Sequence, residues 1–227
     1  MNWYPQEKKV LDIVLKQFIE KNPKKELNGI IVPHAGYKYS GKIAGKAFSL
    51  LHMKKKAIIL GPSHYVGFRG VACLQRVKTP LGKVILPENN YKKLEYEHSV
   101  ENQIPFLQYL GYSEILPLVI GEVGVEEAKK IAQDLAKEDA IFVISTDLSH
   151  FKEYGIASKI DKKSIKYILN LDIDNYKEIN ACGIYPILIL MHLCKIKKWK
   201  PKLIEYKNSG DITEEKSQVV GYASFWF

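Results

Sequence analysis

The sequence predicts an α/β fold, a three-layer αβα single domain with a mixed, mostly parallel central sheet between two helical layers. Short apolar runs alternate along the chain with longer stretches of helical periodicity, which is the pattern of βαβ units. The length of 227 residues fits one domain, 1–227, better than two small ones. The last two apolar runs are less regularly connected to the others, which favours a mixed sheet over a purely parallel one.

The strands are predicted from short apolar runs bounded by Gly, Pro or polar turn residues. In chain order they are 29–32, 57–60, 70–74, 84–86, 115–120, 140–144, 201–207 and 218–227.

The helices are predicted from apolar residues that recur at helical spacing and from start and stop residues. In chain order they are 7–22, 42–51, 90–95, 99–110, 126–137, 156–170, 172–180 and 184–194. Ser40 is expected to cap the second helix, and Asn22 and Pro23 are expected to end the first. The last helix is apolar all round, which predicts that it is buried.

Composition excludes several classes of protein. No apolar run approaches the roughly 18 residues of a membrane span, and residues 1–7 lack the basic region and apolar core of a signal peptide, so we expect a cytoplasmic protein without a membrane partner. The net charge of +9 comes almost entirely from Lys, since Arg occurs only at 69 and 76, and nucleic acid is not the expected partner. The three cysteines show no paired spacing, which argues against a disulfide scaffold.

Three of the expected strands are followed within a few residues by a histidine. They lead to His34, His64 and His150. The carboxyl ends of parallel strands meet at one edge of a sheet, where α/β folds place ligands, so these side chains are expected to converge. For His34, the alternative is a turn histidine that hydrogen-bonds its own loop.

Neutral imidazoles from His34 and His64 suit zinc, copper or iron, and a third ligand is then needed. The candidates for this third ligand are Cys182, Asp147 and His150. Cys182 precedes a predicted helix, whose N-terminus would lower the thiol pKa and favour a metal ligand or a nucleophile. A buried cysteine that serves as a small hydrophobe is the alternative.

Six short motifs together resemble one family. They are residues 33–41, 61–64, 97–101, 145–150, 181–183 and 219–223, in the order in which the Memo family (mediator of ErbB2-driven cell motility) carries them. The fold of that family is similar to that of class III extradiol dioxygenases, which use non-haem iron. The chain departs from the usual pattern in a shorter segment before Trp3 and in residues 210–217.

The resemblance implies a role for each of six residues. The metal ligands would be His34, His64 and Cys182; His150 and Asp147 would be catalytic, with His150 as acid or base; and Trp3 would lie beside the pocket and contact the ligand. Tyr37, His98 and Glu101 are further expected to contact the ligand. Within residues 97–101, we expect Glu97, His98 and Glu101 to support or border the metal site rather than bind the metal. A capping arrangement around Ser99 is the alternative.

The expected function is a metal-dependent redox enzyme of unknown substrate. Iron or copper is the expected metal, with zinc less favoured, and an open site can lose its ion during purification. Catechol cleavage is not expected, because Cys182 would stand where dioxygenases carry a carboxylate. One alternative is a non-catalytic module that binds an anionic or phosphotyrosine-like ligand, since animal Memo proteins are described as binding phosphotyrosine peptides. Another is a hydrolase with Cys182 as nucleophile and His150 as base. The partner would be a small molecule or a peptide.

Overall fold

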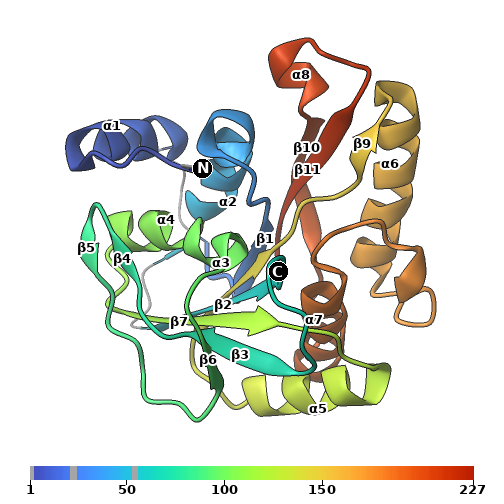
Figure 1. The fold of residues 1–227 in the computed structure, drawn as a ribbon. Coiled ribbons are helices and arrows are strands. Elements are labelled where there is room, and N and C mark those ends of the chain that lie inside the picture. The colour runs from blue at the N-terminus through green and yellow to red at the C-terminus, as the bar shows by residue number, and fades with distance from the viewer. Residues whose placement is uncertain (1–2, 21–24, 53–55) are drawn as a thin grey trace.

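The computed structural model describes residues 3–20, 25–52 and 56–227. Its central sheet has the strand order β10-β11-β1-β8-β2-β7-β3-β6, and β9 pairs with β11 (Figure 1). The strands of this sheet are β1 (Gly29–Val32), β2 (Lys56–Pro62), β3 (Val71–Leu74), β6 (Lys92–Leu94), β7 (Glu114–Ile120), β8 (Ile141–Ser145), β9 (His150–Lys152), β10 (Lys202–Asn208) and β11 (Val219–Trp226).

The middle of the sheet is parallel and its flanks are mixed. Strands β1, β8, β2 and β7 run parallel to one another, whereas β3 is antiparallel to β7 and β11 is antiparallel to β1. This confirms the expected mixed sheet. The segments that follow β1, β2 and β8 therefore leave the sheet at the same edge.

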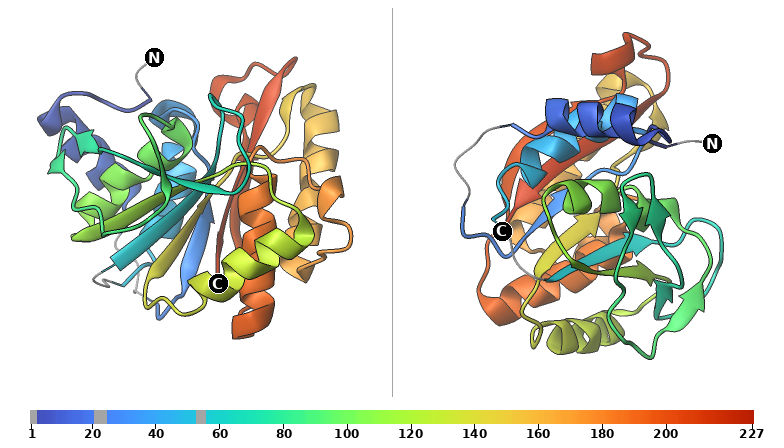
Figure 2. Two further views of the ribbon diagram at one scale, coloured as in Figure 1. Left: turned by 60° about the horizontal axis from the view of Figure 1, so that its bottom comes forward. Right: turned by 90° about the vertical axis from the view of Figure 1, so that its left-hand side faces the viewer.

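Helices cover both faces of the sheet, which gives the expected three layers (Figures 1 and 2). Successive side chains of a strand point to opposite faces, so Ile30 and Val32 enter one apolar core and Ile31 enters the other. The first core is covered by α1 (Lys8–Phe18), α2 (Lys42–Phe48), α3 (His98–Glu101) and α4 (Ile104–Tyr109). The second core is covered by α5 (Val125–Leu135), α6 (Tyr154–Asn170) and α7 (Ile184–Lys197).

Two predictions in the region between β3 and α3 are wrong. Residues 90–95 were expected to be helical, but they contain β6, which pairs in parallel with β3. Residues 84–86 form no strand of their own. Strands β4 (Lys78–Thr79) and β5 (Gly82–Lys83) pair just before them, and Ile85 makes one isolated bridge to Glu114. Edge pairing overrides the weak local preferences here.

Two further predictions fail at helix ends. The expected helix 172–180 is reduced to a 3₁₀ turn, η2 (Tyr176–Glu178), because the Asp172 carboxylate accepts a hydrogen bond from the backbone N–H of Asn175. Ser40 is not the cap of α2. It lies inside a π-helical turn, η1 (Tyr37–Gly41), and its hydroxyl donates to the carbonyl of Ala35 (2.9 Å).

Other boundaries differ from the predictions more modestly. The predicted end of the first helix, at Asn22 and Pro23, lies outside the described residues. The segment 99–110 forms two short helices, α3 and α4, instead of one, and α8 (Gly210–Thr213) was not predicted. In the part of the chain that the structure describes, no helix is long and apolar enough to cross a membrane.

Candidate metal centre

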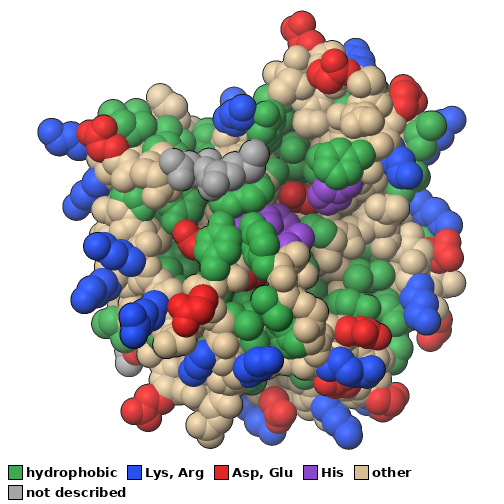
Figure 3. Space-filling view, viewed as in Figure 1, with side chains coloured by type: hydrophobic (Ala, Val, Ile, Leu, Met, Phe, Trp, Pro, Cys, Tyr) green, Lys and Arg blue, Asp and Glu red, His purple; other side chains and the backbone are tan. Residues whose placement is uncertain are grey.

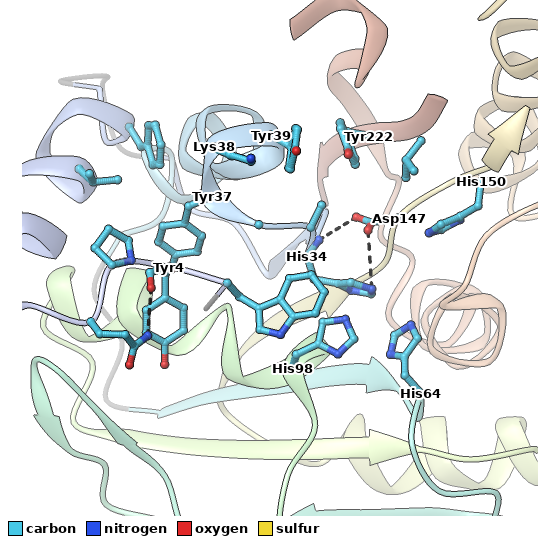
Figure 4. Close-up of a pocket in the computed structure, with 18 residues that line it drawn as sticks. Tyr4, His34, Tyr37, Lys38, Tyr39, His64, His98, Asp147, His150 and Tyr222 are labelled. Carbon is cyan, nitrogen blue, oxygen red and sulfur yellow. Dashed lines mark hydrogen bonds and ion pairs between the residues drawn. The ribbon is translucent and has the colours of Figure 1, made fainter. Parts of the chain in front are cut away.

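Three histidine rings meet at the carboxyl edge of the parallel strands. His34 follows β1, His64 follows β2, and His98 is the first residue of α3. The ring centroids lie 5.1 Å apart for His34 and His64, 5.4 Å for His34 and His98, and 4.5 Å for His64 and His98. One possible ligand nitrogen from each ring lies within 4.8 Å of the other two (Figure 4). We call these residues the three-histidine cluster.

The hydrogen bonds around His34 fix which of its nitrogens carries the proton. Its Nδ1 lies 3.0 Å from the hydroxyl oxygen of Ser145. That hydroxyl donates its single proton to the carbonyl of Ser99 and accepts from the side-chain amide of Gln103, so the bond to His34 must be donated by the imidazole. The Nε2 of His34 therefore keeps a lone pair, which a metal ligand requires.

The carboxylate of Glu97 supports the ring of His64 and lies close to that of His98. Its Oε1 accepts a hydrogen bond from Nδ1 of His64 (3.0 Å), and its Oε2 accepts from the backbone N–H of His64 (2.6 Å). Nδ1 of His98 lies 3.2 Å from the same Oε1, outside hydrogen-bond geometry. A carboxylate on Nδ1 leaves Nε2 as the ligand atom of His64, which is the arrangement that supports metal-bound histidines in many proteins.

Close packing of α3 on β2 places Glu97 beside His64. A Cβ atom on Gly61 would lie 2.6 Å from the hydroxyl of Ser99, so a side chain at position 61 would push α3 away. The same hydroxyl donates to the carbonyl of Pro62 (2.7 Å), and Glu97 also accepts from the backbone N–H of Ser99 (3.0 Å). Glu97 thus combines the two roles considered for this motif: it caps α3 and it supports a histidine.

Burial and hydrogen bonds shift the ionisation of this cluster. Burial lowers the pKa of His34 to about 4, although the carboxylate of Asp147 opposes the shift. Burial opposes ionisation of Glu97, but hydrogen bonds from the His64 ring and from the backbone N–H groups of His64 and Ser99 hold its pKa well below the usual range. The cluster therefore combines a neutral His34 with an ionised Glu97 at neutral pH.

Cys182 lies beside His34 but outside the three-histidine cluster. Its Sγ is 3.3 Å from Nε2 of His34 and accepts a hydrogen bond from the backbone N–H of Asp147 (3.2 Å). The expectation of a lowered thiol pKa is wrong. Burial raises the pKa of Cys182 well above the usual range, and the charge of Asp147 adds to this shift. Together these two effects outweigh the lowering of the thiol pKa that was expected from the nearby N-terminus of α7.

Asp147 and His150 follow β8 and border the same space. One Asp147 oxygen accepts from the backbone N–H of His34 (2.8 Å), and the other lies 3.9 Å from Nε2 of that ring. Nδ1 of His150 lies 2.8 Å from the carbonyl of Leu148, which only accepts, so Nδ1 carries the proton and Nε2 is free to accept one. Figure 4 places His150 beyond Asp147, apart from the three-histidine cluster.

These residues open into a cavity of about 890 Å³. Figure 3 shows histidine side chains in a hollow bordered by hydrophobic ones. The ring of Trp3 stacks on His98, with centroids 4.2 Å apart and an 11° angle between the planes. Tyr37 lines the cavity, as do Tyr39 and Tyr222. The hydroxyl of Tyr4, another lining residue, donates to Glu101 (2.8 Å).

The structure thus brings His34, His64, His98, Asp147, His150, Trp3 and Tyr37 to one cavity. Cys182 does not line the cavity but contacts the His34 ring. Glu101 does not line it either, but accepts a hydrogen bond from Tyr4, which does. Sequence reasoning did not identify Ser145 or Gln103 as supports of His34. The motif 145–150 contained the signal for Ser145, since a hydroxyl at the end of a buried strand needs a hydrogen-bond partner.

Comparisons with known proteins agree with this architecture. A family model described as Memo-like protein matches residues 2–226. A MEMO1 family protein of Methanococcoides burtonii is 38% identical over 226 residues, covering 86% of this chain and 84% of its own. One of Archaeoglobus fulgidus is 30% identical over 252 residues, covering 100% and 96%.

A solved structure shows the same fold at low sequence identity. The uncharacterized protein JW3007 from Escherichia coli K12 is 11% identical, with a TM-score of 0.55, and the match covers 89% of this chain and all of that one. This likeness concerns the fold alone. The family match along almost the entire sequence, together with the 30–38% identity to curated relatives, shows that the chain belongs to the Memo-like protein family.

Proposed function

We propose that the three-histidine cluster binds a redox-active transition metal, iron or copper, and that the protein is a metal-dependent redox enzyme for a small organic molecule. The convergence of His34, His64 and His98 within 4.8 Å supports this proposal most directly. When bound, iron or copper would supply one-electron chemistry and coordination positions open to the cavity.

The residues present fit such a metal. Ser145 leaves a lone pair on Nε2 of His34, and Glu97 does the same for His64. The ionised Glu97 offsets part of the positive charge that a cation would bring into this largely buried site. Three imidazoles suit zinc as well as copper or iron, so the redox part of the proposal requires that one of the latter two is bound.

The third ligand is the point at which the geometry and the family resemblance differ. The resemblance implies Cys182, and the sequence analysis expects His98 to border the site without binding the metal, whereas the cluster in the structure contains His98. We propose His98 as the third ligand and Cys182 as a neighbour that contacts Nε2 of His34. A ligand role for Cys182 remains the competing prediction, and the metal affinities of His98→Ala and Cys182→Ser decide between the two.

The chain's own residues would handle the substrate in the cavity. The largely apolar lining, which includes Tyr4, Tyr37 and Trp3, favours an organic molecule with aromatic or aliphatic parts. In the neutral ring of His150, Nε2 is the nitrogen without a proton, and it can accept one from a substrate hydroxyl. The raised pKa of the Cys182 thiol makes the hydrolase alternative the weaker one.

We expect no catechol cleavage. Class III dioxygenases are expected to use two histidines and one carboxylate, whereas the third position here is His98 or, in the competing prediction, Cys182. Oxygen uptake and ring-cleavage absorbance of iron-loaded protein with a panel of catechols test this. Turnover at about 1 per second or faster would contradict it.

Metal analysis of protein purified without an affinity tag or chelator tests the proposal as a whole. Aerobic and anaerobic preparations, reconstituted where the open site has lost its ion, should each carry iron or copper at close to one ion per chain. A protein that binds only zinc under both conditions would contradict the redox function, and one that binds none of the three after reconstitution would contradict the metal site.

A further inference from the structure

Helix α6 carries a fully buried carboxylate, that of Asp161, which lies against the backbone segment just before His150. Its Oδ1 accepts a hydrogen bond from the backbone N–H of Ser149 (2.9 Å), and its Oδ2 accepts from the hydroxyl of Tyr206 (2.8 Å). Among the described residues, no Lys, Arg or His nitrogen lies within 4.0 Å of it. Burying a carboxylate without a cation destabilises the fold, so the presence of Asp161 at this position calls for an explanation.

The backbone beside Asp161 is the segment that presents His150. The N–H of Leu148 donates to the carbonyl of Gly221 (2.8 Å), and the N–H of Gly221 donates to the carbonyl of Ser149 (2.9 Å). The N–H of Ser149 has no strand partner in this arrangement and donates its hydrogen bond to the carboxylate of Asp161 instead. The carbonyl of Leu148 then accepts from Nδ1 of His150, so the placement of residues 148 and 149 sets the direction of the ring.

Two features show that this placement is tightly specified. A Cβ atom on Gly221 would lie 2.0 Å from Oδ2 of Asp161, so the strand and the carboxylate approach as closely as glycine allows. Phe151, which follows His150, has φ +55°, in the left-handed region that costs a bulky residue roughly 1–2 kcal/mol. A strained backbone next to His150 persists only when neighbouring contacts hold it.

We propose that Asp161 is a positioning residue for His150: by anchoring the N–H of Ser149, it holds Leu148 where its carbonyl keeps the His150 ring in the Nδ1–H tautomer, with Nε2 directed to the cavity. The value of this device rests on the proposed function, in which His150 accepts a proton. The placement itself does not depend on a metal.

The test uses the full chain without added metal, labelled for NMR, and follows two signals. These are the Ser149 amide proton and the tautomer of His150, read from two-bond ring nitrogen–proton couplings. Asp161→Ala should shift His150 away from the Nδ1–H form, whereas the tautomer of His34, which Ser145 sets, should stay unchanged. Tyr206→Phe, which removes only the bond to Oδ2, should leave His150 in the Nδ1–H form.

Asp161→Asn covers the case in which the alanine variant does not fold. It keeps the shape and a neutral acceptor, so His150 should retain its tautomer while the Ser149 amide proton moves upfield, as expected for a weaker acceptor. An unchanged Ser149 signal in this variant, or a His150 tautomer in Asp161→Ala equal to that of the wild type, would overturn the proposal. These signals come from metal-free protein, so their failure is separate from a failure to bind iron or copper.

Discussion

The Oε1 atom of Glu97 lies 3.0 Å from Nδ1 of His64, and the second oxygen of the same carboxylate binds the backbone N–H of His64. This double contact fixes both the position and the tautomer of the histidine before any ligand arrives. The carboxylate is almost fully buried, so its charge acts with little screening by solvent.

Replacement of Glu97 by Gln should weaken metal binding without unfolding the protein. The amide keeps an acceptor for His64 but removes the negative charge, and loss of such a supporting carboxylate lowers metal affinity by roughly 10- to 100-fold. Glu101→Gln is the matched control, because Glu101 binds Tyr4 one helical turn away. Competition titrations against a chromogenic chelator measure both variants. Equal losses in the two would show that Glu97 has no specific role.

Protonation of His34 should destabilise the metal-free protein in mildly acidic solution. Its pKa is about 4 when folded and about 6.5 when unfolded, so between these values the unfolded chain binds more protons. Stability therefore falls as the pH drops from 6.5 to 4, by about 3 kcal/mol from this group.

Denaturant unfolding across this pH range, after chelator treatment, measures the effect. His34→Gln should flatten the pH dependence, whereas His52→Gln should retain it, because His52 is only half-buried and bonds the backbone carbonyl of Lys25, outside the three-histidine cluster. A wild-type slope in His34→Gln would show that the stability loss has another source.

Phe151→Gly should stabilise the fold. The left-handed backbone of Phe151 suits glycine, and the side chain is 69% exposed, so little packing is lost. Compared with Phe151→Ala, which retains a Cβ atom in the strained conformation, the glycine variant should gain up to about 1 kcal/mol in the free energy of unfolding. If alanine is the more stable of the two, the backbone at this position is not strained in solution.

The sequence was sufficient to predict the general position of the site but not its full composition. Apolar runs followed by Pro33 or Pro62 indicated where the chain leaves the sheet ahead of His34 and His64, because Pro has no N–H to donate to a strand partner. The position of His98 depends on how closely α3 packs on Gly61, which is a tertiary contact without a local signal.

The remaining differences have similar causes. Residues 92–94 form a strand because β3 offers them an edge to pair with. Asp161 can lie on the buried face of α6 because Ser149 and Tyr206 donate hydrogen bonds to its carboxylate. The thiol of Cys182 illustrates competing local and tertiary effects. A following helix predicted a lowered pKa, but burial next to Asp147 raises it.

The most direct test of the account is the affinity for Fe(II), Cu(I) and Zn(II) of the wild type, His34→Ala, His64→Ala, His98→Ala and Cys182→Ser, measured anaerobically by chelator competition. The account predicts one site per chain for iron or copper, at least a 10-fold loss of affinity in each histidine variant, and a smaller loss in Cys182→Ser. Wild-type affinity in His98→Ala, together with a large loss in Cys182→Ser, would contradict the three-histidine centre.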